Sequence, residues 1–391
     1  MFLSNTMSNV SIPIGFRSIT ANIGIRDSKD DLTIVVSEVP ATLSAVFTQS
    51  RFAGPSVTLS RSVADRHSAR GAIIIARNAN VATGRKGLIN AEEVRSSVAH
   101  IVGSSPDEFL IASTGVIGRQ YPMERIRDYF QSLKSPFPPA NFLHCATAMM
   151  TTDTVSKYVS TKIGDATLVG IAKGVGMIEP NMATMLAFFF TDAEIPWVDL
   201  NPIFRKVVDR TFNALSIDTD TSTSDTAAIF ANGLSGSVDL GVFEQALYKV
   251  ALNLVRKIAA DGEGASKLIE VRVRGARDDS QAKRVAKAVV NSPLVKTAVH
   301  GSDPNWGRVA MAIGKCEDED DIVPEKVRIF FGDVEAYPSE VDESTLTCIT
   351  QYLDGNEIVI GIDLGISEGE FTVYGCDLTE EYIKINTSYT T

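Results

Sequence analysis

The chain has 391 residues, of which 44% are hydrophobic and 22% are charged, as expected for a globular protein of one large or two ordinary domains. Its net charge of −11 and pI near 5.0 argue against nucleic-acid and anionic-membrane partners, because both need a basic surface. Its four cysteines lack a CxxC pair, no run approaches the roughly 18 apolar residues of a membrane span, and the N-terminus lacks signal-peptide features. We therefore expect a soluble cytoplasmic protein with free thiols.

The first half of the sequence alternates short β-like runs with helical stretches. Strands are expected where β-branched residues dominate, at 32–37, 44–47, 72–76, 109–112, 158–163 and 166–171. Helices are expected at 90–102, with Asn90 as the N-cap, and at 123–132 and 141–150. The turn signal Gly164-Asp165 predicts that the last two strands form a hairpin.

The second half repeats this alternation, which indicates an α/β protein. Helices are expected at 199–213, 242–260, 280–290, 305–313 and 340–353. Strands are expected at 268–273, 294–299, 327–331, 358–364 and 371–374. The polar tract 216–226 and the acidic run 317–321 are interpreted as a structural segment and a solvated loop.

The stretch KGVGMIEPNMATML, residues 173–186, is the most informative part of the chain. Pro180 makes a continuous strand up to Thr184 unfavourable, and two glycines allow close backbone approach beside Lys173. Thr184 stands immediately before the apolar run 185–190. It is therefore either the first residue of a strand or a nucleophile presented by a rigid element.

Histidine usage bears on this choice, because none of the four histidines lies in a nucleophile elbow or in metal-ligand spacing. A threonine without a histidine base can use its own α-amine, with a reference pKa of about 7.7–8.0, if it is the first residue of a chain. Attack of the Thr184 hydroxyl on the Ala183 carbonyl, an N-to-O acyl shift and ester hydrolysis would expose that amine. The residues alone leave both interpretations of Thr184 open.

Several blocks along the chain resemble one family in the family's order. They read RNANVATG (77–84), STGVIG (113–118), MTTDT (150–154), GIAKGVGMIEPNMATML (170–186), DGEG (261–264) and NTSYTT (386–391). Together they cover essentially the whole chain and resemble the ornithine acetyltransferases, the autoprocessing glutamate N-acetyltransferases of arginine biosynthesis.

The resemblance implies a fold, a processing step and a reaction. The implied fold is an α/β stacked-sheet sandwich with outer helices, of the DmpA-like, N-terminal-nucleophile type. The proenzyme would cut itself between Ala183 and Thr184 into chains 1–183 and 184–391, which form one catalytic unit and assemble as a heterotetramer of two chains of each kind. Acetyl transfer from N-acetylornithine to glutamate would proceed by a ping-pong acetyl-threonine mechanism without cofactor or metal.

The same resemblance implies roles for particular residues. Thr184 would be the nucleophile, and the Thr114 hydroxyl and Gly115 N–H would form the oxyanion hole. The amino-acid substrates would be bound by Thr151, Lys173, Thr184, Glu263, Asn386 and Thr391. Without the resemblance, structural explanations suffice for several of them, such as a threonine turn, a solvated lysine, a loop glutamate and a frayed chain end.

Two positions depart from the common family pattern: Val175 replaces a usual serine, and Glu179 replaces a usual histidine. Both are similar to a subgroup that includes paralogues from clavulanic-acid gene clusters. They leave open whether acetyl-CoA is also a donor, and whether the pathway is arginine biosynthesis or specialised metabolism. Two rival functions also stay open: an N-terminal-nucleophile amidohydrolase that gives the acetyl group to water, and an unprocessed binding protein.

Overall fold

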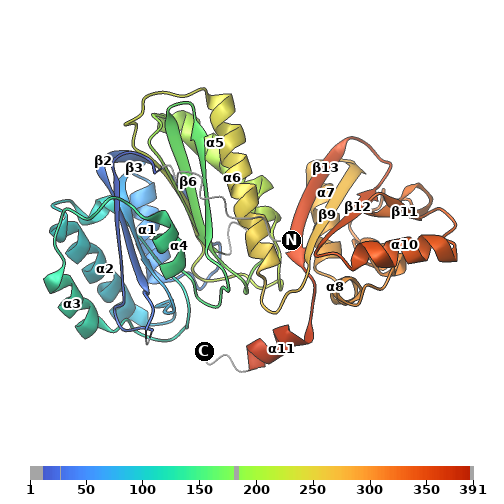
Figure 1. Ribbon diagram of the computed structural model, residues 1–391, viewed down its shortest axis with the longest axis horizontal. Coiled ribbons are helices and arrows are strands. Elements are labelled where there is room, and N and C mark those ends of the chain that lie inside the picture. The colour runs from blue at the N-terminus through green and yellow to red at the C-terminus, as the bar shows by residue number, and fades with distance from the viewer. Residues whose placement is uncertain (1–11, 27, 180–184, 388–391) are drawn as a thin grey trace.

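The computed structural model describes residues 12–26, 28–179 and 185–387, which form two sheets with surrounding helices (Figure 1). The strands are β1 (Phe16–Ala21), β2 (Leu32–Phe47), β3 (Ser68–Ile75), β4 (Phe109–Ser113), β5 (Lys157–Ile163), β6 (Ala166–Lys173), β7 (Leu186–Thr191), β8 (Thr226–Ala231), β9 (Leu268–Ala276), β10 (Arg328–Phe331), β11 (Val334–Tyr337), β12 (Glu357–Asp363) and β13 (Gly369–Cys376). The helices are α1 (Pro55–Ala64), α2 (Gly84–Ile101), α3 (Met123–Ser132), α4 (Phe142–Ala148), α5 (Trp197–Arg210), α6 (Leu240–Ala260), α7 (Asp279–Val290), α8 (Pro293–His300), α9 (Trp306–Gly314), α10 (Glu343–Leu353) and α11 (Glu380–Thr387). Three short 3-10 turns lie at Pro106–Glu108, Phe212–Ala214 and Pro324–Lys326.

The larger sheet has eight strands in the order β4-β3-β2-β8-β7-β6-β5, with β1 also paired to β2. The 16-residue strand β2 joins its two halves, because its first part pairs with β1 and β3 and its last part, from Thr42, pairs with β8. The two halves stack face to face, so that Phe16 of β1 meets Phe190 of β7 with ring centroids 5.4 Å apart. The predicted stacked-sheet α/β architecture is confirmed.

Apolar side chains fill the space between and outside these stacked halves. The inner core contains Phe188 and Phe190 of β7 and Phe142 of α4, together with residues of α1. Helices α2 and α3 cover the outer face of β3 and β4, and α5 and α6 cover the outer face of the other half (Figure 1). Because helices lie outside both halves, the ends of the strands and their loops are left to form sites.

The smaller sheet has five strands in the order β11-β10-β12-β9-β13, and α7, α8 and α9 pack near it. It shares one hydrophobic cluster with α6 and the larger sheet, so the two sheets form a continuous body. Strands β7 and β8, which follow residue 184, pair with β6 and β2, which precede it. A cut at the predicted bond would therefore leave the two chains interleaved in one sheet.

The prediction of a strand at 294–299 is wrong, because these residues lie in helix α8. Pro293 occupies the first turn, and the Ser292 hydroxyl accepts a hydrogen bond from the Val295 N–H at 3.4 Å. Buried Val295, Ala298 and Val299 follow helical spacing. The strands predicted at 32–37 and 44–47 are parts of the single strand β2, and the helix expected from Asn90 begins at Gly84.

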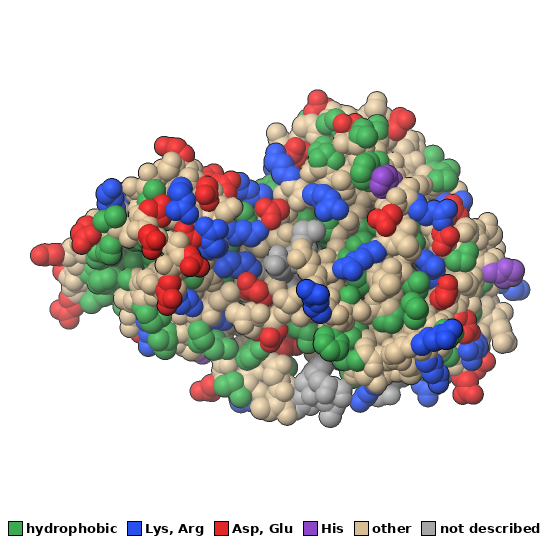
Figure 2. Space-filling view, turned by 180° about the vertical axis from the view of Figure 1, so that it is seen from behind, with side chains coloured by type: hydrophobic (Ala, Val, Ile, Leu, Met, Phe, Trp, Pro, Cys, Tyr) green, Lys and Arg blue, Asp and Glu red, His purple; other side chains and the backbone are tan. Residues whose placement is uncertain are grey.

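Three features expected from composition can be compared with the structure. No helix in the described ranges is long and apolar enough to cross a membrane. All four cysteines are free, and two of them, Cys145 and Cys376, are buried. Figure 2 shows acidic and basic side chains interspersed over the rear face of the molecule.

Candidate active site

Three predicted site residues meet at the end of β6. The Lys173 side chain is buried, and its Nζ donates to Thr114 Oγ1 at 3.3 Å and to Thr151 Oγ1 at 3.4 Å. Thr114 directly follows β4, and Thr151 follows α4. Lys173 is also the register partner of Leu186, the first residue of β7 and the second residue after Thr184. Strands β6 and β7, which precede and follow the predicted cut, are thus paired beside this cluster.

The hydrogen bonds orient the two threonine hydroxyls differently. A protonated lysine only donates, so each hydroxyl that meets Lys173 uses an oxygen lone pair there and keeps its own proton. The Thr151 hydroxyl donates a hydrogen bond to Asp153 Oδ2 at 3.3 Å. The Thr114 hydroxyl has no acceptor among the described residues. Thr114 is therefore the hydroxyl that can donate to a group arriving from outside.

Two buried carboxylates, Asp153 and Asp225, lie near enough to Lys173 to favour its charged form. Burial lowers the pKa of Lys173, and the nearby carboxylates of Asp153 and Asp225 offset this in part. Burial alone would raise the pKa of Asp153, but Lys157, Lys173 and the Gly174 N–H bring it to about 2. Burial raises the pKa of Asp225 well above its ordinary value, and its Oδ2 makes no hydrogen bond within the described part of the chain.

The turn after β4 brings Gly115 against the backbone of Arg77. Gly115 has φ +132°, and a Cβ built there would lie 2.2 Å from the Arg77 carbonyl carbon. The neighbouring Thr114 and Val116 N–H groups are bonded to the Ile75 and Arg77 carbonyls. Among the described residues, none accepts a hydrogen bond from the Gly115 N–H. Only glycine fits this turn, and its N–H remains available to a ligand.

Glu263 lies on the loop after α6 and joins three segments. Its carboxylate accepts hydrogen bonds from Thr152 Oγ1 at 3.0 Å and from Asn386 Nδ2 at 3.1 Å. Its N–H donates to the Val175 carbonyl at 2.8 Å. Helix α11 lies below the ends of β6 and α6, away from the smaller sheet (Figure 1), and this is how Asn386 reaches Glu263. The C-terminal segment up to residue 387 therefore folds back as its predicted role requires.

The polar tract 216–226 holds the segment that precedes the predicted cut. Asp218 accepts hydrogen bonds from the Met177 and Ile178 N–H groups at 2.6 and 2.7 Å. The Glu179 N–H donates to the Asp220 carbonyl at 3.0 Å. The chain is thus fixed up to Glu179, and the tract is a structural part of this site.

Glu179 itself sits in a polar cluster. Its carboxylate forms an ion pair with Lys287 at 3.2 Å and accepts hydrogen bonds from the Ser216 hydroxyl and, at 2.9 Å, from Asn291 Nδ2. The other departure from the family pattern, Val175, is buried in the core. Ala183, Thr184 and Thr391 lie outside the described residues, so their predicted roles stay predictions.

A model of the ArgJ family matches residues 17–391 of this chain. The chain belongs to the ArgJ family. It is 60% identical over 390 residues to glutamate N-acetyltransferase Oat2 of Streptomyces clavuligerus, and the alignment covers 98% of this chain and 99% of that protein. It is 54% identical to the arginine biosynthesis bifunctional protein ArgJ of Rhodococcoides fascians, over 97% of this chain and 94% of that protein. The crystal structure of arginine biosynthesis bifunctional protein argJ from Bacillus halodurans matches with TM-score 0.48 and 37% identity, over 53% of this chain and 100% of that chain.

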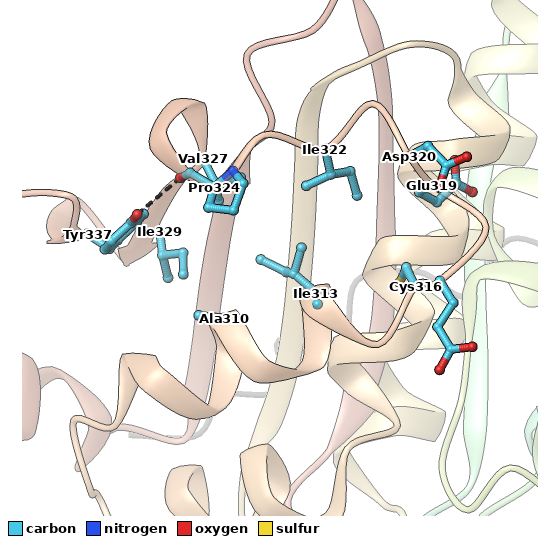
Figure 3. A pocket seen from close by; sticks show the side chains of 12 residues that line it. Ala310, Ile313, Cys316, Glu319, Asp320, Ile322, Pro324, Val327, Ile329 and Tyr337 are labelled. Carbon is cyan, nitrogen blue, oxygen red and sulfur yellow. Dashed lines mark hydrogen bonds between the residues drawn. The ribbon is translucent and has the colours of Figure 1, made fainter.

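Two cavities of this ArgJ-family chain lie at different distances along the fold from the cluster of Lys173, Thr114 and Thr151. A cleft of about 470 Å³ is lined in part by Thr151, Thr152 and Asp153 and therefore adjoins Lys173. Another, of about 350 Å³, lies between α9 and β10 and is lined mainly by apolar side chains such as Ile313, Ile322 and Ile329 (Figure 3). The second contains none of the predicted site residues, so the first is the candidate substrate site.

The residues that the sequence analysis missed are mostly charged partners of those it named. Asp153 lies inside the MTTDT block, Lys157 pairs with both Asp153 and Asp261 at 2.7 and 2.6 Å, and Asp225 lies in the polar tract. The signal for Asp153 was its place in a recognised block. In the described parts of the chain, no group of three or more His, Cys, Asp or Glu side chains could hold a metal ion.

Proposed function

We propose that this chain is an autoprocessing acetyltransferase of arginine biosynthesis that moves the acetyl group from N-acetylornithine to glutamate. The observation that carries the proposal is the contact of Lys173 with both Thr114 and Thr151, at the strand end paired with Leu186. Family membership supports it, since a relative with 60% identity is named glutamate N-acetyltransferase. The proposed products are ornithine and N-acetylglutamate.

The first proposed step is self-cleavage. The Thr184 hydroxyl attacks the Ala183 carbonyl carbon, the Ala183–Thr184 C–N bond breaks, and the nitrogen leaves as the new α-amine. Water then hydrolyses the resulting ester, which gives the Ala183 carboxylate and restores the hydroxyl. The hydrogen bonds that hold the backbone of Ile178 and Glu179 support this step, because an ordered approach to the scissile bond lowers the entropy cost of attack.

The second proposed step is acetyl transfer in two halves. The α-amine of Thr184 accepts the hydroxyl proton as the oxygen attacks the acetyl carbonyl of N-acetylornithine, and ornithine leaves with a proton on its amine. The glutamate amine then attacks the acetyl ester and releases N-acetylglutamate. In both halves the Thr114 hydroxyl and the Gly115 N–H donate to the oxyanion, and their freedom from other acceptors among the described residues supports this role.

Charge complementarity supports the proposed substrate contacts. Protonated Lys173 would meet a substrate carboxylate, and Glu263, already oriented by Thr152 and Asn386, would meet the ornithine ammonium. Thr151, Thr184, Asn386 and Thr391 would complete the set of residues that bind the amino-acid substrates. The proposed assembly is a heterotetramer of two chains 1–183 and two chains 184–391.

The test is denaturing electrophoresis of the wild type and the Thr184→Ala variant, combined with an acetyl-transfer assay. We expect two wild-type fragments, the second beginning at Thr184, and an intact, inactive variant. N-acetylornithine and acetyl-CoA are supplied separately as donors, because relatives named bifunctional raise the question of a second donor. Light scattering of the purified protein reports the number of chains.

The rival functions predict other results. A single full-length band after prolonged incubation would favour the unprocessed binding protein. Acetate released at the same rate with and without glutamate would favour the amidohydrolase. Cleavage of Thr184→Ala at the same bond would rule out the self-cleavage chemistry.

A further inference from the structure

The cleft beside Thr151 carries cationic side chains that the proposed reaction has not used. Its charged lining residues are Arg26, Lys29, Arg77, Asp30 and Asp153. Asp153 is already occupied by the Lys157 ammonium at 2.7 Å and the Gly174 N–H at 2.8 Å. Among the described residues, neither Arg26 nor Arg77 forms an ion pair. The cleft therefore has two guanidinium groups available for an anion.

Arg77 shows two signs of a residue held for a ligand. Its backbone has φ +70°, a left-handed conformation that costs an ordinary side chain about 1–2 kcal/mol. Its Nε is buried and makes no hydrogen bond with any described residue. Unsatisfied buried donors are uncommon, so this one needs a partner that the protein does not supply. The Arg77 backbone also packs against Gly115, so residue 77 lies next to the proposed oxyanion hole.

Arg26 is positioned by its own loop. Asp31 accepts the N–H groups of Ile25 and Arg26, both at 2.8 Å, and so fixes the backbone between β1 and β2. One Arg26 Nη donates to the Thr151 carbonyl at 3.3 Å and the other to the Asp30 carbonyl at 3.4 Å, which leaves its remaining N–H groups for a ligand. Burial, followed by the positive charge of Arg77, lowers the pKa of Arg26, which agrees with two guanidinium groups facing one region.

Thr152 connects this cationic cleft to Glu263. It lines the cleft, and its hydroxyl donates to the Glu263 carboxylate at 3.0 Å. The two proposed substrates carry opposite charges on their side chains, an ammonium on N-acetylornithine and a carboxylate on glutamate. Glu263 would attract the first and repel the second, so one pocket built around Glu263 does not suit both.

We infer that Arg77 and Arg26 form a separate subsite for the side-chain carboxylate of glutamate, so that donor and acceptor side chains occupy opposite sides of Thr152. The inference rests on the proposed acetyl transfer and adds residues that bind its acceptor. Guanidinium groups suit this task, because their paired N–H donors match the two carboxylate oxygens.

The experiment separates the two half-reactions. Exchange of labelled ornithine into N-acetylornithine without glutamate measures the donor half, and N-acetylglutamate formation at varied glutamate measures the acceptor half. The variants are Arg77→Gly and Arg26→Met. Glycine suits the left-handed backbone at position 77, so Arg77→Gly is expected to fold. Arg85→Met is the control, because exposed Arg85 on α2 carries the same charge outside the cleft.

We expect Arg77→Gly and Arg26→Met to lower kcat/KM for glutamate about 10- to 100-fold, the effect of losing a hydrogen bond to a charged group. Ornithine exchange should change by less than about threefold in the same variants, and Arg85→Met should leave both activities unchanged. An Arg77→Lys variant should recover part of the glutamate activity, since it restores the charge without the paired donors.

Three results would overturn the inference. One is unchanged kcat/KM for glutamate in Arg77→Gly while ornithine exchange proceeds. Another is an equal loss in both half-reactions, which would mean that Arg77 only supports the Gly115 turn. The third is an effect confined to the KM of acetyl-CoA, which would assign the cleft to phosphate groups. Failure of the proposed function is distinct, because wild-type protein would then show no ornithine exchange at all.

Discussion

Replacing Gly115 with alanine should disable acetyl transfer, whereas the same change at Gly118 should not. Both glycines lie in the turn after β4 and have positive φ, +132° at Gly115 and +82° at Gly118. A Cβ at Gly118 meets nothing within 4 Å, but a Cβ at Gly115 would lie 2.2 Å from the Arg77 carbonyl carbon. Both variants therefore place alanine at an unfavourable φ, but only Gly115→Ala adds a collision with the backbone.

The magnitudes follow from these two costs. An unfavourable φ costs alanine roughly 1–2 kcal/mol at Gly118 and at least as much at Gly115, whose φ lies further from the left-handed helical region. The lower entropy of the unfolded chain offsets part of this equally in both variants. Forcing the backbone at Gly115 away from Arg77 adds about 1–3 kcal/mol, the usual cost of overpacking. Gly115→Ala should thus be less stable than Gly118→Ala by at least about 1–3 kcal/mol.

Activity should separate the variants further, because the displaced backbone carries the Gly115 N–H. Loss of one oxyanion donor lowers kcat about 10²–10³-fold, whereas Gly118→Ala should stay within about threefold of wild type. The measurements are urea unfolding and acetyl transfer at saturating substrates. Wild-type kcat in Gly115→Ala, or equal stability of the two variants, would refute the reasoning.

Two further variants test the charges around Lys173. In the folded wild-type protein the pKa of Asp153 is lowered to about 2, so its carboxylate stabilises the fold above its ordinary pKa of about 4. This contribution, on the order of 2 kcal/mol, is lost as the pH falls towards 2. Asp153→Asn should lack this contribution at every pH. Urea unfolding at several pH values should therefore show that the unfolding free energy of Asp153→Asn falls less steeply with acid than that of the wild type. The same steepness in both proteins would contradict the lowered pKa of Asp153. Glu263→Gln keeps the shape that Thr152 and Asn386 contact, so its unfolding free energy should change by less than about 1 kcal/mol while KM for N-acetylornithine rises about tenfold or more. An unchanged KM would remove Glu263 from the donor site.

The sequence predicted most strands and helices because their apolar spacing is a local signal. It failed at 294–299, where a run of apolar residues fits either period and the decision depended on Pro293 and the cap at Ser292. It also divided β2 into two strands, because Pro40 interrupts the pattern while pairing with different partners on either side keeps the strand continuous. Such pairing is set by distant segments, which no local pattern contains.

The candidate site was predicted only where a block of sequence carried it. Thr114, Thr151 and Lys173 each lie in such a block, and the fold brings them into contact. Arg77 also lies in such a block, but its place beside Arg26 could not be predicted, because the two residues lie after β3 and in the loop between β1 and β2. The pairing of β1 and β3 with β2 brings these two segments to one cleft.

The position of the proposed cut explains how one chain could become two without losing its site. Strand β7 pairs with β6 through six residue pairs and with β8 through six more, so its place does not depend on the peptide bond before Thr184. The two products would share the cluster, with Thr114 and Lys173 before the cut and Asp225 and Glu263 after it. Since neither product holds a complete set, activity requires that the sheet stays assembled. The proposed cut would lie outside the paired residues of β6 and β7, so it would leave intact the strand ladders that hold the site in place.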